Sequence, residues 1–239
     1  MTKSAAIYAI VQARMSSERL PGKVLREANG KPLLKYVMER LAKSKLLDGM
    51  LVATSTDKTD DPITQYCKKE NVEYFRGDLK NVAARFLGAL QKYKISAFVR
   101  ISADSPLIDP QLVTKAIEIF KNGDYDIVTN ALKRSFPKGQ SVEVVRSSRF
   151  SENFDKIKNS DELEHVTKYF YNNSECFKIF NFFADNDCSK INFCVDTQED
   201  LDRFVLILNQ MNTPSITYGW QDLIKIYGRL QKNSQACLN

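Results

Sequence analysis

The sequence predicts an α/β protein built on a three-layer, doubly wound, mostly parallel sheet. Short apolar runs rich in β-favouring residues alternate with amphipathic segments of helical period as far as residue 130. Strands that alternate with helices favour right-handed crossovers and helices on both faces of the sheet. The chain has 239 residues, of which 43% are hydrophobic, which is enough for one substantial domain of this kind.

The first half of the chain supplies the parallel core. Ile7, Ile10 and Val11 belong to an apolar run that is typical of a buried parallel strand. An Asn29-Gly30 turn follows, and then apolar residues recur at helical spacing. We expect strands at 7–11, 50–54, 72–75, 97–101 and 125–129, and helices at 32–44, from about 62, at 82–93 and at 110–122.

The pattern changes after residue 130. The later elements expected are a β run at 142–145, a helix over 147–172, two aromatic-rich β segments at 176–184 and 190–195, and helices at 198–209 and 220–231. The two β segments could pair as a hairpin. We therefore predict a single domain, residues 1–239, with a small α+β insertion at about 133–190 that covers the substrate and mediates dimerisation.

The loop after the first strand is a candidate phosphate site. Small residues let a backbone approach an anion, hydroxyls and amides donate hydrogen bonds, and cations supply charge. Ligands bind at the carboxyl ends of parallel strands, where this loop lies. A solvated basic loop is the alternative that the residues alone leave open. Neither GxxxxGK[ST] nor GxGxxG occurs, which excludes a Walker loop and a dinucleotide fingerprint.

The loop sequence QARMSSERLPGKVL resembles the signature loop of the CMP-sugar synthetase superfamily, and most closely its SpsF-like, spore-coat branch. The resemblance implies a nucleotide-diphospho-sugar transferase-like fold and a cytidylyltransferase. Such an enzyme transfers CMP from CTP to an acidic sugar, a nonulosonate or related keto-sugar acid, and releases pyrophosphate for surface glycan synthesis. The nucleotide-binding residues that it implies here are Gln12, Ala13, Arg14, Ser16, Ser17, Arg19 and Lys23, with Arg14 and Lys23 also catalytic.

Two acidic residues are candidates for binding Mg²⁺. Asp104 follows an apolar strand, in ADSPLID, and Asp196 opens the segment VDTQEDL. From the residues alone, either carboxylate could instead cap a helix. The resemblance implies that Asp104 is a catalytic metal ligand and that Asp196 is the second one. Because Mg²⁺ is usually held by one or two carboxylates plus phosphate oxygens, we expect Asp104 and Asp196 to converge.

Three further arginines lie near predicted strand ends or helix starts, and each alone would more often be a surface residue. The segment FRGDLKNVAARF resembles the SpsF-like segment after the third strand, although that branch commonly has Asp where this chain has Asn81. The resemblance assigns Arg76 and Arg100 to the nucleotide pocket and makes Arg85 a weaker candidate.

The acceptor residues expected from the resemblance are Gln140, Glu143 and His165. Gln140 and Glu143 lie in FPKGQSVEVV, where Lys138-Gly139-Gln140-Ser141 replaces the common Asp-Gly-x-Asp. His165 lies in ELEHVTKYF and is the single histidine. A lone histidine is more often structural, but it could contact the acceptor or accept a proton near neutral pH.

Composition limits the other possibilities. The net charge is +6, but the sequence contains no long basic block and no aromatic–basic RNA motif. We therefore expect polyanionic small substrates, CTP and an acidic acceptor, and no nucleic acid. Five cysteines without a C-x-x-C pair fit reduced cytoplasmic thiols and argue against structural zinc. No signal-peptide pattern and no run of about 18 apolar residues occurs, so we expect no membrane association.

Alternatives from other classes also remain at this stage. A phosphorylated or phosphonate acceptor is one, and a non-catalytic nucleotide-binding partner in glycan assembly is another. A glycosyltransferase would need an Asp-x-Asp motif, and Asp124-Tyr125-Asp126 precedes a strand instead of ending one. The phenylalanines of the insertion are consistent with a homodimer interface or with core packing, and they are Phe177, Phe180, Phe182 and Phe183.

Overall fold

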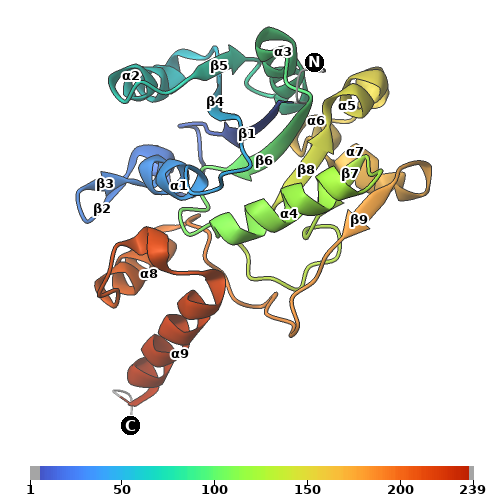
Figure 1. The fold of residues 1–239 in the computed structure, drawn as a ribbon. Helices are drawn as coiled ribbons and strands as arrows, with labels where there is room; N and C mark the ends of the chain where they lie inside the picture. Colours follow the sequence, from blue (N-terminus) through green and yellow to red (C-terminus); the bar gives the residue numbers. More distant parts are fainter. Residues whose placement is uncertain (1–5, 237–239) are drawn as a thin grey trace.

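A computed structural model describes residues 6–236, with side chains described as far as residue 232. Its central feature is a seven-stranded sheet in the order β5-β4-β1-β6-β8-β7-β9 (Figure 1). The neighbours β5, β4, β1 and β6 pair in parallel, and only β8 runs antiparallel to both of its neighbours. The strands are β1 Ile7–Gln12, β4 Gly49–Ser55, β5 Tyr74–Gly77, β6 Ala97–Ser102, β7 Ile127–Thr129, β8 Glu143–Arg146 and β9 Ile179–Asn181.

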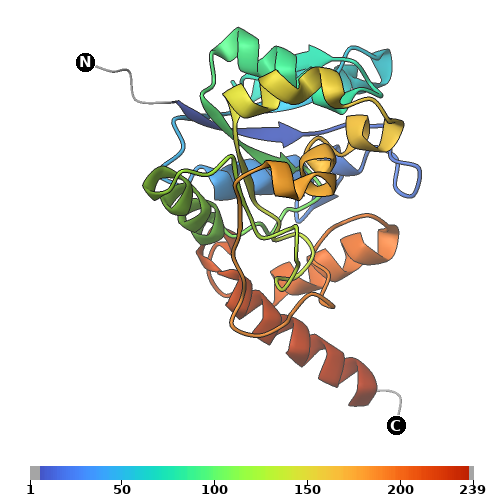
Figure 2. The same ribbon diagram turned by 90° about the vertical axis from the view of Figure 1, so that its right-hand side faces the viewer.

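Helices cover both faces of this sheet, which confirms the predicted three-layer α/β fold (Figure 2). The apolar residues of β1 alternate between the two faces: Ala9 and Val11 join one buried cluster and Ile10 joins the other. The first cluster receives α1 Leu33–Leu41, α2 Asp61–Lys69 and α4 Pro110–Asn122. The second receives α3 Val82–Tyr93, α5 Ser147–Asn153 and α7 Lys168–Asn172.

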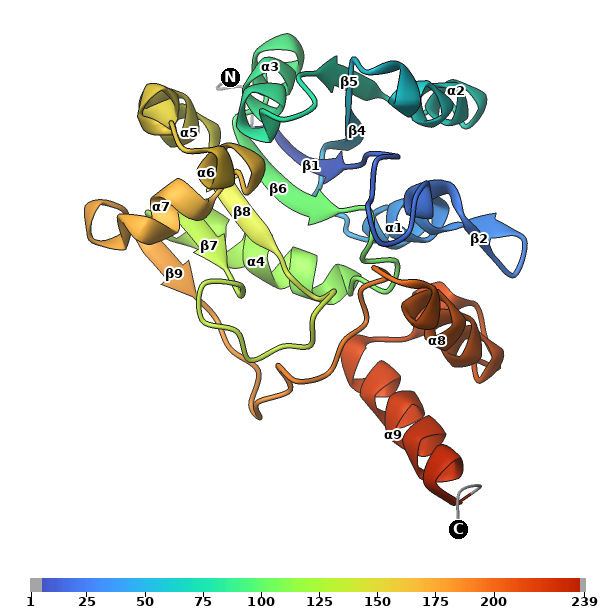
Figure 3. The same ribbon diagram turned by 180° about the vertical axis from the view of Figure 1, so that it is seen from behind.

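The two C-terminal helices form a third buried cluster with α1. They are α8 Gln198–Asn209 and α9 Trp220–Ala236, and α9 extends away from the sheet (Figure 3). Tyr36 of α1 meets Phe204 of α8 edge to face, with ring centroids 5.1 Å apart. A capping box between Thr197 and Asp200 starts α8, so the predicted helix begins where its acidic first turn indicated.

The helix predicted over 147–172 is wrong as a continuous element. The segment divides into α5, a 3-10 turn, α6 Ser160–Glu164 and α7. Asn159 caps the start of α6, and Val166 adopts a left-handed φ of 35°, which no helix can accommodate. Val166 is fully buried, and this packing holds the unfavourable backbone in place.

The predicted hairpin between 176–184 and 190–195 is also wrong. β9 pairs in parallel with β7, while segment 190–195 forms only an isolated bridge between Lys138 and Asn192. The Lys138 amide donates to the Ile191 carbonyl and the Phe193 amide donates to the Lys138 carbonyl, each at 2.9 Å. These bonds to the loop before β8 occupy the backbone groups that a hairpin would have used.

Short elements complete the described chain. A two-stranded ribbon carries the Asn29-Gly30 turn, and the 3-10 helices join longer elements; these pieces are β2 Glu27–Ala28, β3 Lys31–Pro32, η1 Lys23–Leu25, η2 Lys58–Asp60, η3 Phe154–Lys156, η4 Ser174–Cys176 and η5 Ser215–Thr217. No helix within residues 6–236 combines the length and the apolar character needed to cross a membrane.

Candidate active site

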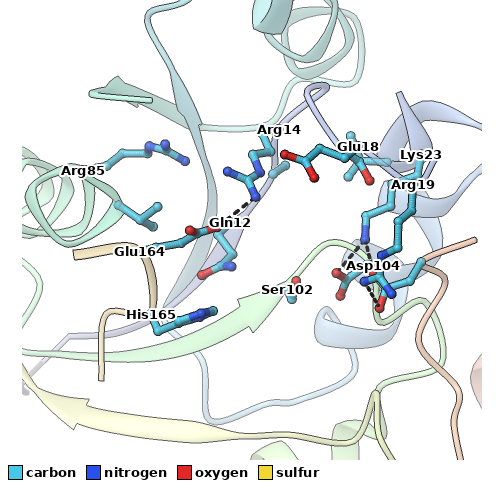
Figure 4. A pocket seen from close by; sticks show the side chains of 15 residues that line it. Gln12, Arg14, Glu18, Arg19, Lys23, Arg85, Ser102, Asp104, Glu164 and His165 are labelled. Carbon is cyan, nitrogen blue, oxygen red and sulfur yellow. Dashed lines mark hydrogen bonds and ion pairs between the residues drawn. The ribbon is translucent and has the colours of Figure 1, made fainter. Parts of the chain in front are cut away.

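A cavity of about 630 Å³ opens at the carboxyl ends of β1 and β6 (Figure 4). Lys23, Arg19 and Asp104 lie at one end, whereas Arg85, Glu164 and His165 lie at the other. Most of the site residues expected from the sequence line this cavity, namely Gln12, Ala13, Arg14, Ser17, Arg19, Lys23, Asp104, His165 and Asp196.

The charged end of the cavity is organised by Lys23. Its ammonium Nζ lies 2.9 Å from Asp104 Oδ2 and 2.6 Å from Asp196 Oδ1. Arg19 adds a second cation, 3.0 Å from the other oxygen of Asp196. Burial of Lys23 alone would lower its pKa, but attraction to Asp104 and Asp196 outweighs burial and raises that pKa above the usual 10.5. Lys23 is therefore a permanent cation between two carboxylates.

Backbone contacts fix both carboxylates. The amide of Val195 donates to the carbonyl of Asp104 at 2.9 Å, so the segment before Asp196 is tied to the end of β6. The Asp200 carboxylate then accepts from the amides of Asp196 and Thr197 at 3.0 and 3.1 Å. These bonds explain how two acids so distant in sequence come to face one ammonium group.

The signature loop is held by a residue that the sequence did not single out. Asp60 is fully buried, and its carboxylate accepts from the Met15 amide at 2.7 Å and from the Ser55 hydroxyl at 2.5 Å. Gly22 has a φ of 69°, which allows the turn that returns Lys23 to the cavity. Asp60 follows a strand and precedes a helix, a position where an acidic residue is common as a helix cap and therefore gives no specific signal.

The arrangement could hold a divalent cation. Asp104 and Asp196 are the carboxylates whose oxygens already share one positive group, and both line the cavity. Among the described residues there is no cluster of three or more His, Cys, Asp or Glu side chains suited to a metal. A hard cation that takes two protein carboxylates and completes its shell with phosphate and water therefore fits this donor set.

The opposite end of the cavity carries two guanidinium groups. Arg14 pairs with Glu164 at 2.9 Å, which links the signature loop to the end of α6. Arg85 is buried and donates to the carbonyls of Asp78 and Leu79, and its pKa is lowered mainly by burial and further by the nearby Arg14. His165 also lines this end, where its exposed ring lies 3.5 Å from an Asp161 oxygen.

The structure does not bring Arg76 or Ser16 to the residues that line the cavity. Arg76 instead donates to the carbonyls of Ser55 and Asp57 at 2.7 and 2.9 Å and pairs with Asp61 at 2.8 Å. Its guanidinium thus joins β5 to the loop after β4. The family resemblance implied a nucleotide contact for Arg76, but all three nitrogens of its guanidinium contact neighbouring residues of the protein.

Arg100 reaches the site through other side chains. Its Nε donates to Gln12 Oε1 at 3.0 Å, and its Nη1 lies 2.5 Å from Glu143 Oε2. The other Glu143 oxygen accepts from Thr167 and Tyr171 at 2.6 and 2.5 Å. Burial would raise the pKa of Glu143, but Arg100 and the two hydroxyls outweigh it and lower that pKa below its usual value. Gln12 is oriented by this network.

Two of the expected acceptor residues therefore have structural contacts. Gln140 is fully buried, accepts from the Asp109 amide at 2.8 Å and donates to the Leu107 carbonyl at 2.7 Å. It lines neither the main cavity nor the smaller one beside it, and its amide group binds these two main-chain groups instead. Glu143 does line the smaller cavity, but its carboxylate is already neutralised by Arg100.

A family model described as "Cytidylyltransferase" matches residues 8–221. The chain belongs to the cytidylyltransferase family. The spore coat polysaccharide biosynthesis protein SpsF of Bacillus subtilis is 33% identical to it, over 81% of this chain and 82% of the relative. An uncharacterized protein of Methanocaldococcus jannaschii, MJ1063, is 32% identical over 96% of this chain and 92% of its own length.

Two further comparisons bear on activity. A 3-deoxy-manno-octulosonate cytidylyltransferase of Hydrogenovibrio crunogenus is 32% identical over 50% of this cytidylyltransferase and 48% of the relative. The solved structure of a cytidylyltransferase from Leptospira borgpetersenii superimposes with a TM-score of 0.90 at 28% identity, covering 96% of each chain. The protein is a CTP-dependent nucleotidyltransferase, as the resemblance of its signature loop implied.

Proposed function

We propose that this cytidylyltransferase transfers CMP from CTP to an acidic sugar, releases pyrophosphate and uses Mg²⁺, in the synthesis of a surface glycan. The observation that carries the proposal is the convergence of Asp104 and Asp196 on the Lys23 ammonium at one end of the main cavity. Nucleotidyl transfer requires carboxylates that bind a metal ion and cations that bind phosphate, and this end of the cavity has both.

The residues of this chain would act by charge and position. An acceptor oxygen attacks the α-phosphorus of CTP, so negative charge must approach negative charge. Lys23, Arg19 and Arg14 would hold the triphosphate and oppose its charge, which is the main way that such sites lower the barrier. Asp104 and Asp196 would hold Mg²⁺, which supplies further positive charge to the phosphate oxygens. His165 lies at the other end of the cavity and is available to contact a substrate.

The relatives support the acceptor class. Two of them are described as 3-deoxy-manno-octulosonate and 8-amino-3,8-dideoxy-manno-octulosonate cytidylyltransferases, and SpsF acts in polysaccharide biosynthesis by its name. An acidic keto-sugar is therefore the acceptor that we favour, with a phosphorylated or phosphonate acceptor as the alternative. A non-catalytic nucleotide-binding partner would have no use for the paired acids and cations that line the cavity.

The test is a pyrophosphate-release assay with a panel of substrates. Each of CTP, UTP, ATP and GTP is combined with 3-deoxy-manno-octulosonate, N-acetylneuraminate and neutral sugars of similar size, with Mg²⁺ or with EDTA. We expect release only with CTP, an acidic acceptor and the metal. Equal release with neutral sugars, or release that persists in EDTA, would contradict the proposal.

We also infer that residues 1–239 act as one domain whose insertion, at about 133–190, covers the acceptor and contributes to a homodimer. Phe180 of the edge strand β9 and Phe183 just after that strand support this inference because they are 37% and 51% exposed. Light scattering after size exclusion tests it: Phe183→Ser should shift a dimer toward monomer, and a monomeric parent protein would exclude it. The cytoplasmic location remains a prediction from the sequence.

A further inference from the structure

A smaller cavity of about 230 Å³ adjoins the main one. Ser102 and Asp104 line both cavities, so the two meet at the carboxyl end of β6. A molecule in the smaller cavity would therefore have one of its groups beside the Lys23–Asp104 end, where the triphosphate is proposed to lie. This position suits the acceptor rather than the nucleotide.

Three cations and two carboxylates line the smaller cavity, and both carboxylates already have a cationic partner. Asp104 is paired with Lys23, and Glu143 is paired with Arg100. The other cations of the lining are Arg134 and Lys138. Within residues 6–232, the guanidinium of Arg134 donates to the Ser141 hydroxyl at 2.9 Å and has no carboxylate partner, and the Lys138 ammonium has no ion-pair partner.

The loop that carries these cations is fixed on both sides. The backbone of Lys138 exchanges two hydrogen bonds with Ile191 and Phe193, as described above. Gly139 has a φ of 88°, and a Cβ there would lie 2.9 Å from the carbonyl carbon of Phe193, so the two segments are in close contact. The buried Gln140 side chain anchors the next residue to the start of α4. Lys138 thus projects from a backbone that is held on both sides, and Arg134 precedes it on the same loop.

We propose that Arg134 and Lys138 bind an oxyanion of the acceptor, either a carboxylate or a phosphoryl group, and leave its attacking hydroxyl directed toward Asp104. This assignment rests on the proposed function and makes these two residues determinants of acceptor specificity. An arginine fork and a lysine point charge recognise such anions through charge-assisted hydrogen bonds. Gln140 then anchors the loop and Glu143 lines the cavity, while Arg134 and Lys138 contact the acceptor.

Steady-state kinetics with the best acceptor from the pyrophosphate assay provides one test. Arg134→Gln and Lys138→Gln should each raise the acceptor KM about tenfold or more, because each removes one charged contact. The CTP KM should change less than about twofold. Lys133→Gln is the matched control, since Lys133 is an exposed cation of the same loop that does not line the cavity. Acceptor KM values that stay at the wild-type level in both variants overturn the proposal.

A binding measurement separates this site from the proposed activity. Lys138-Gly139 is the only Lys-Gly pair in the sequence, so labelling Lys with carbonyl ¹³C and Gly with ¹⁵N isolates the Gly139 amide by NMR. Inorganic phosphate and 3-deoxy-manno-octulosonate, titrated separately, distinguish a phosphoryl from a carboxylate ligand. We expect one of them to shift this amide saturably in wild type and in Lys133→Gln, but at least tenfold more weakly in Arg134→Gln or Lys138→Gln.

The outcomes of the two tests are distinct. Saturable shifts that the variants abolish support the anion site, even if no acceptor yields pyrophosphate, and in that case only the proposed function fails. Wild-type protein that shows no shift with either anion, or variants that bind as well as wild type, overturn the site whatever the activity is.

Discussion

Replacing Lys23 with alanine is the most direct test of the charged end of the cavity. The ammonium makes two charge-assisted contacts, at 2.9 Å to Asp104 and 2.6 Å to Asp196, and its side chain is only 11% exposed. Losing one preorganised charged contact to a transition state costs about 2.7–4 kcal/mol, so turnover should fall by about 10²–10³-fold.

The assay for Lys23→Ala is pyrophosphate release at saturating CTP and acceptor, with thermal unfolding measured in parallel. Lys225→Ala is the matched control, because Lys225 pairs with Asp222 on the surface and its side chain is 75% exposed. The control should keep wild-type turnover. If Lys23→Ala is folded and turns over within tenfold of wild type, then Lys23 does not stabilise the transition state and the reasoning is refuted.

The remaining predictions concern three other side chains. Asp104→Asn should lower pyrophosphate release at least a hundredfold while circular dichroism stays unchanged; near-wild-type release would remove Asp104 from the chemistry. Glu143→Gln leaves Arg100, whose side chain is 18% exposed, without its charge partner and should lower the free energy of unfolding by about 3–5 kcal/mol in urea titrations at pH 7. The pKa of Glu143 lies below its usual 4.5 in the folded state, so its stabilisation is complete above that value and is lost as the pH falls through the folded pKa. Unfolding titrations between pH 3 and 7 should therefore show a shallower loss of stability in acid for Glu143→Gln than for wild type, and equal slopes would contradict the ion pair. Gln140→Ala leaves the buried Asp109 amide without its hydrogen-bond acceptor and should lower the free energy of unfolding by about 2–4 kcal/mol without changing the CTP KM. A raised CTP KM in a stable variant would indicate a substrate contact instead.

Most of the fold could be predicted from the sequence, because burial on one or two faces imposes a pattern on the chain. The continuous apolar run of β1, which is buried on both faces, and the helical spacing of Leu34, Val37 and Leu41 in α1 are local signals that the tertiary structure preserves. The prediction of one helix over 147–172 was wrong because tertiary packing overrides the local pattern there. The spacing of apolar residues does not indicate a left-handed residue such as Val166, because only tertiary packing stabilises that backbone conformation.

The arrangement of the candidate site could be predicted less well from local sequence patterns. That Asp104 and Asp196 approach one ammonium group depends on contacts between distant segments, and only the family resemblance suggested it. A polar side chain can also face either a cavity or a buried main-chain group, and sequence does not distinguish the two. The resemblance placed Gln140 and Arg76 at substrates, whereas both bind backbone carbonyls or amides in the structure.

The hydrogen bonds of the short segment before Asp196 limit how much the length of that segment can vary. The Phe193 amide donates a hydrogen bond to the Lys138 carbonyl in the loop before β8, and the Val195 amide donates one to the Asp104 carbonyl. Only one residue, Cys194, separates the two donors. If a residue were added or deleted at Cys194, the Phe193 and Val195 amides could not both keep these hydrogen bonds, and Asp196 would move away from Lys23. Residues 185–187 are exposed and lie between the amides of Ala184 and Cys188, which both donate to Ser135, so an added residue there can extend into solvent. Homologous or engineered insertions should therefore accumulate at 185–187 and be excluded from 193–196.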